Sequence, residues 1–253
     1  MKISSLLTYI VFMSSVCLHA NQSVAWHDAT HMAVAKAAGL DNYIYLAVGA
    51  DMTKEKTRER EAGNHYNNTP KGVEITPEMV LAQFSDYNKP TDADGHLYGA
   101  IVASVTECLV RATGGKYALY PLGFTAHYLG DLSMPFHNID YNYFNEINHS
   151  ANDGIVEKPS GKDEAMDVKV SRIAAEIQKR MTSLPPIQLR TDIRYFYRDL
   201  ATAVATIANK ASKLGYAIQE TIPPRTLLTE EEAYMQLAQS AQLLKVVYEA
   251  TIK

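Results

Sequence analysis

The chain has 253 residues, of which 47% are hydrophobic and 21% charged, and this is enough apolar material for one well-buried domain. Its formal net charge of −4 gives no overall attraction for the phosphate backbones of nucleic acids, although a local patch or bound cations could reverse this. Beyond residue 25 no segment is apolar for long enough to predict a transmembrane helix.

The first 25 residues have the composition of a signal peptide. Lys2 precedes an apolar run over residues 6–17, and Ser23-Val24-Ala25 places small residues at the −3 and −1 positions of a cleavage site. The run is short and is interrupted by hydroxyl residues, so a retained membrane anchor is the weaker interpretation. We therefore expect export, to a periplasm or outside the cell, and a mature protein that begins at Trp26.

Helical signals dominate the first half of the mature chain. Asp28 can cap a helix over residues 29–38 that Gly39 stops, and a second helix begins near residue 41 and carries Asp51 towards its end. Residues 64–73 are expected to form a loop. Thr76 before a proline predicts a helix to about residue 87, and another runs from about Asp94 to the glycine pair at 114–115.

The second half contains four further predicted helices and one long loop. Residues 117–133 form a helix that ends before Pro135, and residues 138–161 are polar, lack a helical period and predict a long ordered loop. Apolar residues at three- and four-residue spacing predict helices over 162–183, 191–217 and 229–251. No alternating apolar pattern predicts a strand, so we expect an all-α single multi-helix domain over residues 26–253.

The segment from His127 to His137 is the strongest candidate for a metal site. His127 and Asp131 are four residues apart on a predicted helix, which places both side chains on one face. Pro135 ends that helix, so His137 can turn back towards the same centre. A lone histidine is more often a hydrogen-bonded or surface residue, and a lone aspartate is more often a cap or a surface charge.

Further histidines repeat this pattern elsewhere. His149 and Asp153 have the same four-residue spacing, and His65 lies in the predicted loop over 64–73. Together with His31, five of the seven histidines in the mature chain can be assigned to one cluster, which leaves His27 and His96 as structural or surface residues.

These residues resemble the zinc-dependent phospholipase C and S1/P1 nuclease superfamily, which has an all-helical fold and a trinuclear zinc site. The segment His127-Tyr-Leu-Gly-Asp131-Leu-Ser-Met-Pro-Phe-His137 is similar to the core motif of that superfamily, and Asp51 precedes His65 by 14 residues, as its pattern requires. The mature start Trp26-His-Asp-Ala-Thr-His31 resembles the opening of the nuclease branch.

The resemblance implies three Zn²⁺ ions and a role for each matching residue. One zinc would take Asp51, His65, His127 and a bridging Asp131. A second would take the amine and carbonyl of Trp26 together with His31 and Asp131. A third would take His137, His149 and Asp153. It also implies phosphodiester hydrolysis by a zinc-activated hydroxide, with Asp51 as a ligand and candidate catalytic base.

The resemblance leaves the substrate open between phospholipid and single-stranded nucleic acid. Asp153 after His149 favours the nuclease branch, whereas the absence of that branch's Gly-Gly-Asn stretch and the pair His149-Ser150 favour phospholipase C. We take a phospholipase C-like enzyme as the first hypothesis, an S1/P1-type nuclease or nucleotidase as the second, and an inactive metal-binding protein as the third. Residues that could contact substrate, or only pack, are Tyr66, Tyr141, Tyr143 and Phe144.

Overall fold

The structure is a computed structural model that describes residues 26–54, 58–111, 119–157 and 164–251. Within these ranges the regular elements are helices, and no strand occurs. The all-α class expected from the sequence is therefore confirmed. The predicted signal peptide and the glycine pair at 114–115 lie outside the described residues.

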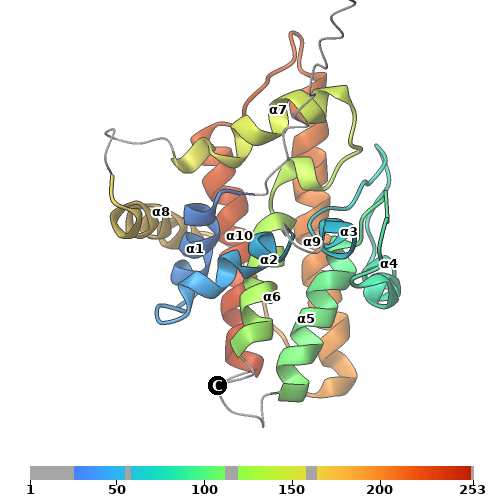
Figure 1. Cartoon of the computed structure of the whole chain (residues 1–253), viewed down its shortest axis with the longest axis vertical. Coiled ribbons are helices and arrows are strands. Elements are labelled where there is room, and N and C mark those ends of the chain that lie inside the picture. The colour runs from blue at the N-terminus through green and yellow to red at the C-terminus, as the bar shows by residue number, and fades with distance from the viewer. Residues whose placement is uncertain (1–25, 55–57, 112–118, 158–163, 252–253) are drawn as a thin grey trace, which may run out of the picture.

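Most helices of the first half of the chain are short, and the longest helices, α9 and α10, lie in the second half (Figure 1). The elements of the first half are α1 (Asp28–Ala37), η1 (Ile44–Val48), α2 (Gly49–Lys54), α3 (Arg58–Glu61), η2 (Ala62–Asn64), α4 (Pro77–Ala82), η3 (Gln83–Asp86) and α5 (Leu97–Arg111). Those of the second half are α6 (Leu119–Leu132), η5 (Pro135–His137), α7 (Tyr143–Asp153), η6 (Ile155–Glu157), α8 (Met166–Met181), α9 (Ile193–Glu220) and α10 (Glu230–Thr251).

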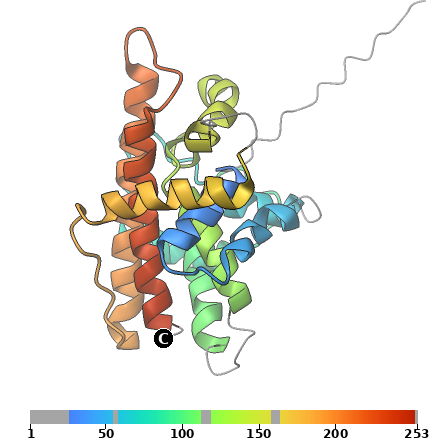
Figure 2. The same cartoon turned by 90° about the vertical axis from the view of Figure 1, so that its left-hand side faces the viewer.

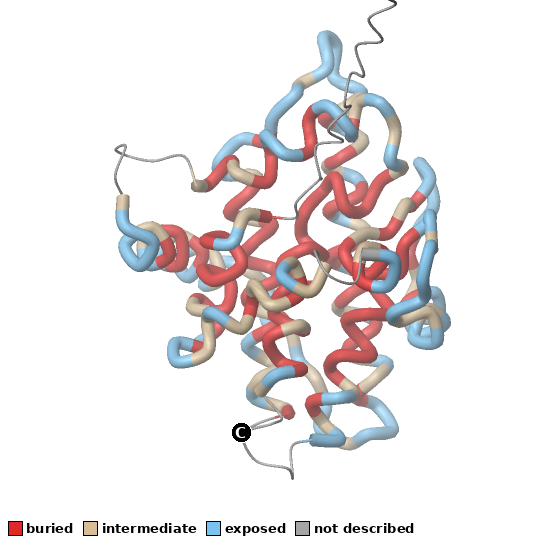
Figure 3. Tube along the Cα trace, in the orientation of Figure 1, coloured by how far each residue is buried: buried red, intermediate tan, exposed pale blue. Residues whose placement is uncertain are grey.

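Helix α6 lies at the centre of the molecule. It packs against α5, α10 and α1, while α8 crosses α10 and covers α1 (Figure 2). Buried residues gather along these central helices, and exposed residues lie at the ends and on the outer loops (Figure 3). Because α6 carries His127 and Asp131, the central packing holds the middle of the predicted metal site in place.

The prediction of a loop over residues 138–161 is wrong, because the structure has α7 and η6 in this region. Asn142 caps α7, with its side-chain oxygen accepting a hydrogen bond from the backbone N–H of Asn145 at 3.0 Å. The buried face of α7 is polar, with Asn145, Asn148, His149, Asn152 and Asp153. A helix whose buried face is polar has no apolar stripe, so the apolar period could not reveal it.

The start of the first helix also differs from the prediction. Asp28 is the first residue of α1 and not its cap, and His27 occupies the cap position without a side-chain hydrogen bond. Glu157 supplies the acceptor instead, because its Oε1 takes hydrogen bonds from the backbone N–H and the hydroxyl of Thr30 at 2.8 and 2.9 Å. Gly39 follows the helix with φ of +90°, as expected of a glycine that ends it.

The remaining boundaries differ by a turn or less in most places. The helix predicted from near residue 41 is a 3-10 turn followed by the short α2, and the helix predicted to about residue 87 changes to 3-10 geometry after Ala82. Thr76 caps α4 as predicted, accepting from the N–H of Met79 at 3.3 Å. None of the described helices has the length and apolar content needed to cross a membrane.

Candidate metal centre

Eight side chains predicted as ligands converge from separate elements onto one end of α6. They come from α1 (His31), α2 (Asp51), the residue after η2 (His65), α6 (His127 and Asp131), η5 (His137) and α7 (His149 and Asp153). Seven of these side chains are buried, and Asp51 is the most exposed, with 14% of its side-chain surface accessible. Both carboxylate oxygens of Asp51 are themselves buried, so its exposed surface belongs to its other atoms.

Four ligand atoms form a compact set that agrees with the first zinc site inferred from sequence. His65 Nδ1 lies 3.0 Å from Asp131 Oδ2 and 3.1 Å from His127 Nε2, and His127 Nε2 lies 3.3 Å from Asp131 Oδ2. Asp51 Oδ1 lies 3.7 Å from both His65 Nδ1 and His127 Nε2. Ligand atoms about 2.1 Å from a tetrahedral zinc are separated by about 3.4 Å, so these spacings suit that geometry.

The second carboxylate oxygen of Asp131 faces different histidines. Its Oδ1 lies 3.4 Å from His31 Nε2 and 3.5 Å from His137 Nδ1. One carboxylate thus presents one oxygen to each of two groups of ligands, which is the arrangement that a bridging residue requires.

A third group lies beyond η5. The ligand atoms of His137, His149 and Asp153 lie within 4.8 Å of one another, and His149 Nε2 is 3.6 Å from Asp153 Oδ1. The four-residue spacing brings these two residues together on one face of α7, and not in a loop as predicted.

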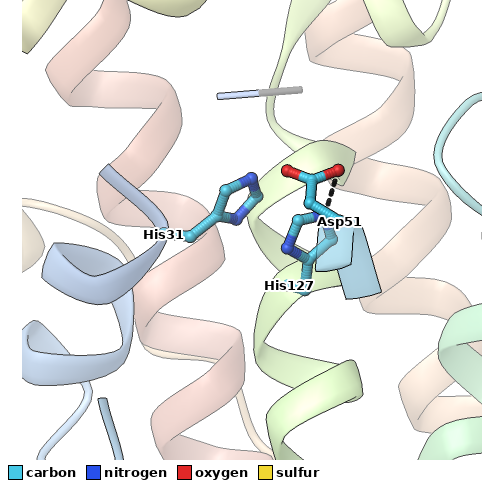
Figure 4. A group of neighbouring side chains, drawn as sticks. All are labelled: His31, Asp51 and His127. Atoms are coloured by element: carbon cyan, nitrogen blue, oxygen red, sulfur yellow. Dashed lines mark ion pairs between the residues drawn. The ribbon is translucent and has the colours of Figure 1, made fainter. Parts of the chain in front are cut away.

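The structure also groups residues that the sequence assigned to different ions. His31, Asp51 and His127 offer ligand atoms within 4.8 Å of one another, and they reach this place from α1, α2 and α6 (Figure 4). The rings of His31 and His127 are stacked, with centroids 3.8 Å apart and planes 15° apart. Asp51 therefore lies between the first and second predicted ions, where it can serve either.

Polar groups behind two histidines fix which ring nitrogen faces the site. His127 Nδ1 is 2.8 Å from the carbonyl oxygen of Ala47, so it carries the proton and leaves Nε2 free to ligate. His149 Nδ1 is 2.9 Å from Asn145 Oδ1, which has the same effect on His149. Such outer partners are typical of histidines that bind metals.

The electrostatics of the site favour a bound cation. Burial lowers the pKa of His149 to about 3 and holds the pKa values of His31, His65 and His137 well below their ordinary range. Burial raises the pKa of Asp153 well above its usual value. The cluster thus contains neutral imidazoles and carboxyls that are costly to ionise, and a bound cation would favour both the free imidazole lone pair and the carboxylate.

Asp131 and His127 form a coupled pair within this cluster. Burial raises the pKa of Asp131, against the opposing effect of His127. Burial would lower the pKa of His127, but the Asp131 and Asp51 carboxylates outweigh it and raise the value to about 9. Without a cation, the pair holds a proton where ligand binding would need two free lone pairs.

Unsatisfied polar atoms show that these residues fit a metal. Among the described residues, eleven buried side-chain nitrogen and oxygen atoms have no hydrogen-bond partner, and ten of them belong to seven predicted ligands. Buried polar atoms are almost always paired in native proteins, so this concentration needs an explanation. Metal coordination satisfies lone pairs of this kind, and mixed imidazole and carboxylate donors suit Zn²⁺.

A contact between Trp26 and Gly130 brings the predicted start of the mature chain to the same helix. Trp26 is fully buried, and its indole Nε1 donates to the carbonyl oxygen of Gly130 at 3.1 Å. A Cβ at Gly130 would lie 2.5 Å from His31 Nδ1, so glycine is required here for α1 to approach α6. Whether the amine and carbonyl of Trp26 are ligands stays a prediction, because residue 25 is outside the described range.

The four aromatic residues predicted near the substrate have different environments. Tyr66 donates its hydroxyl to the carbonyl oxygen of Asp92 at 3.1 Å, and Phe144 packs 6.1 Å from Phe136 between ring centroids. Tyr141 and Tyr143 are exposed. The first two therefore have packing roles in the fold, and contact with substrate remains a prediction for all four.

His96, left outside the cluster on sequence grounds, is a buried structural residue. Its Nδ1 lies 3.0 Å from Asp92 Oδ2 and its Nε2 lies 2.9 Å from Asn64 Oδ1. His27 is the N-cap residue of α1, and its ring packs against Gly154. A Cβ at Gly154 would lie 2.8 Å from the His27 ring, so a side chain does not fit there.

Three residues that contact the ligand histidines or shift their pKa values were not predicted from the sequence. Glu61 lies 3.4 Å from His65 Nε2, and Asn145 holds His149. Lys54 follows Asp51 by one turn of α2, and after the larger effect of burial its charge lowers the pKa values of His65 and His149. Glu61 and Asn145 each precede their histidine by four residues, the same spacing that identified the ligands.

Two comparisons with known proteins identified no relative of this chain. No protein-family model matches the chain, and a search of curated proteins found no match.

Proposed function

We propose that this protein is an exported zinc-dependent phosphodiester hydrolase of the phospholipase C type. The observation that carries the proposal is a set of four ligand atoms whose measured separations of 3.0 to 3.7 Å suit one tetrahedral zinc. These atoms belong to Asp51, His65, His127 and Asp131. The second oxygen of Asp131 and the third group extend the set to the three ions that the resemblance implies.

Bound zinc ions would polarise a phosphate and lower the pKa of a coordinated water. The protein's own residues would supply the geometry. The buried carboxylate oxygens of Asp51 have no hydrogen-bond partner, so the carboxylate could both hold a zinc ion and orient or deprotonate a water beside it. Lys54, one turn further along α2, would bind a non-bridging phosphate oxygen and neutralise part of its charge.

The outer face of α7 favours a phospholipid over a nucleic acid. Tyr143 is 76% exposed and Ile147 is 57% exposed, four residues apart and opposite the buried His149. Ile222 is 95% exposed, in a loop that Asn152 fastens to α7 through hydrogen bonds to Thr226 and Leu228. Exposed tyrosine and isoleucine suit contact with a lipid interface, whereas phosphate backbones are bound mainly by lysine and arginine.

The test compares substrates with protein that begins at Trp26 and is loaded with zinc. We expect phosphatidylcholine vesicles to release phosphocholine and diacylglycerol, while single-stranded DNA and RNA remain intact. Nucleotide release with intact lipid would instead establish the nuclease hypothesis. If zinc-loaded protein cleaves neither these substrates nor small chromogenic diesters, the protein is a metal-binding protein without this activity.

A double variant tests the contribution of α7 to lipid hydrolysis. Tyr143→Ser with Ile147→Ser should lower the rate on vesicles but leave the rate on a soluble short-chain phosphatidylcholine unchanged. Val110→Ser is the matched control, because Val110 is 73% exposed on α5, which carries none of the predicted ligands. Equal rates for all three proteins on vesicles would contradict a role for this face.

A further inference from the structure

Glu61 has a buried carboxyl group and is not a ligand of any predicted metal ion. Only 3% of its surface is exposed, and it ends α3 one turn before His65. The Tyr128 hydroxyl donates to its Oε1 at 2.6 Å, and Asn64 Nδ2 donates to its Oε2 at 3.1 Å. Both donors are neutral, and the ionic contact of Glu61 is with His65 Nε2 at 3.4 Å. A buried carboxyl is costly, so this placement calls for a function.

The two nitrogens of His65 face opposite surroundings. Nδ1 points to the first group of ligand atoms, 3.0 Å from Asp131 Oδ2, whereas Nε2 points to Glu61. A neutral imidazole carries one proton. With the proton on Nε2, the N–H lies 3.4 Å from the Glu61 carboxylate, an ion-pair contact without hydrogen-bond geometry, and the ring turns a lone pair to the metal site. The other tautomer would place a lone pair against a carboxylate and an N–H into the cation site, and both are unfavourable.

The surroundings of Glu61 hold it in this place. Tyr128 adjoins His127 on α6, so its bond to Glu61 ties α3 to the helix that carries the ligands. Asn64 is held in turn by Asn88, through a bond of 2.9 Å, and by His96, through a bond of 2.9 Å. The carboxylate therefore cannot move away from His65 without breaking several buried hydrogen bonds.

The other ligand histidines with assigned outer partners have neutral ones. His127 donates to a backbone carbonyl and His149 to the amide oxygen of Asn145. A carboxylate in this position raises the basicity of the imidazole more than a neutral acceptor does, and so strengthens the bond of that histidine to the metal.

We propose that Glu61 is a positioning residue, which fixes the tautomer of His65 with Nδ1 as the ligand atom and strengthens zinc binding at the first ion. This inference rests on the proposed metal centre. Its charge acts through the imidazole, and Glu61 touches neither ion nor substrate.

The test is Glu61→Gln, which keeps the size of the side chain and its ability to accept from Tyr128. We expect zinc affinity at one of three sites to fall about 10- to 100-fold, so that a competing chelator leaves two ions where the native protein keeps three. The metal-free variant should unfold at the same temperature as the metal-free native protein or higher, because a buried carboxyl has been removed. Tyr128→Phe is the control that keeps the carboxylate, and it should retain the third ion.

A purely structural role predicts the opposite pattern. Glu61→Gln and Tyr128→Phe would then both lower the unfolding temperature of the metal-free protein, and both would keep three zinc ions with native affinity, which would overturn the inference. Nitrogen NMR of the zinc-loaded native protein gives a second measurement that needs no variant. We expect a protonated Nε2 and a metal-bound Nδ1 in His65, and ligation through Nε2 would overturn the proposal. A native protein that binds no zinc would refute the metal centre itself.

Discussion

Asp131→Asn should separate a bridging ligand from a buried structural charge. The carboxylate lies 3.0 Å from His65 Nδ1 and 3.3 Å from His127 Nε2 through one oxygen, and 3.4 Å from His31 Nε2 through the other. Asparagine keeps the shape of the side chain but replaces one oxygen with an amide nitrogen that does not bind metal. One of the two groups therefore loses a ligand, whichever way the amide is turned.

The expected effect follows from linkage between metal binding and folding. With free zinc at about 1,000 times its dissociation constant, each occupied site stabilises the folded protein by about 4 kcal/mol. For a chain of this size, about 2–4 °C of unfolding temperature corresponds to 1 kcal/mol, so the loss of one site should lower the unfolding temperature in zinc by about 8–16 °C. Without zinc, the variant should be less stable than the native protein, because it loses the carboxylate that pairs with protonated His127, so the change on adding zinc is the quantity to compare.

Metal analysis after dialysis against a weak chelator, together with thermal unfolding in the presence and absence of zinc, measures both quantities. The variant should also lose the phosphodiesterase activity that we propose. In the metal-free protein, NMR titration of His127 should show its pKa falling from about 9, since the Asp131 charge is the first influence that opposes the effect of burial. Unchanged zinc content with an unchanged thermal shift would refute the bridging assignment.

Three further predictions address the surroundings of the site. Gly130→Ala should lower zinc content and thermal stability, because its Cβ would lie 2.5 Å from His31 Nδ1, and native metal content in this variant would show that α1 has room to move. If the charge of Lys54 binds the substrate phosphate, Lys54→Met should raise KM for diesters about tenfold while zinc content stays native. Steady-state kinetics and metal analysis measure the two quantities, and an unchanged KM would contradict this role. In acid, the metal-free protein should lose stability as the pH falls from about 6.5 towards 3, because the unfolded chain then protonates His149 while burial keeps its folded pKa at about 3. Urea unfolding should show a loss of about 1.4 kcal/mol per pH unit for each such histidine, and His149→Gln should lessen the slope.

The ligands could be found from sequence because helical spacing is local. His127 and Asp131, and likewise His149 and Asp153, are four residues apart, and this brings each pair together whatever the rest of the fold does. The same rule could have identified Glu61 before His65 and Asn145 before His149. These two were not found because neither position was expected to lie on a helix that faces the site.

The long helices were predictable for a different reason. Helices α9 and α10 bury apolar faces against the core, so their periods are visible in the sequence and their starts agree with the prediction to within two residues. Helix α7 was hidden because its inner face is made of asparagine, histidine and aspartate, which serve the site and not the core. Tertiary relations such as the stacking of His31 on His127, or the use of both oxygens of Asp131, depend on how α1 and η5 pack on α6 and have no local signature.

The inverted pattern of α7 links the two halves of the proposed function. A surface helix normally turns apolar side chains inwards and polar ones outwards, yet here His149 and Asp153 are buried while Tyr143 and Ile147 are exposed. Metal binding would explain the polar inner face, since ligation satisfies buried polar atoms that otherwise have no hydrogen-bond partner. A substrate in a membrane would explain the exposed apolar outer face, because these side chains would bring the lipid phosphate close to the ion held by the same helix. A nucleic-acid substrate explains only the inner face, and for this reason we place phospholipid first.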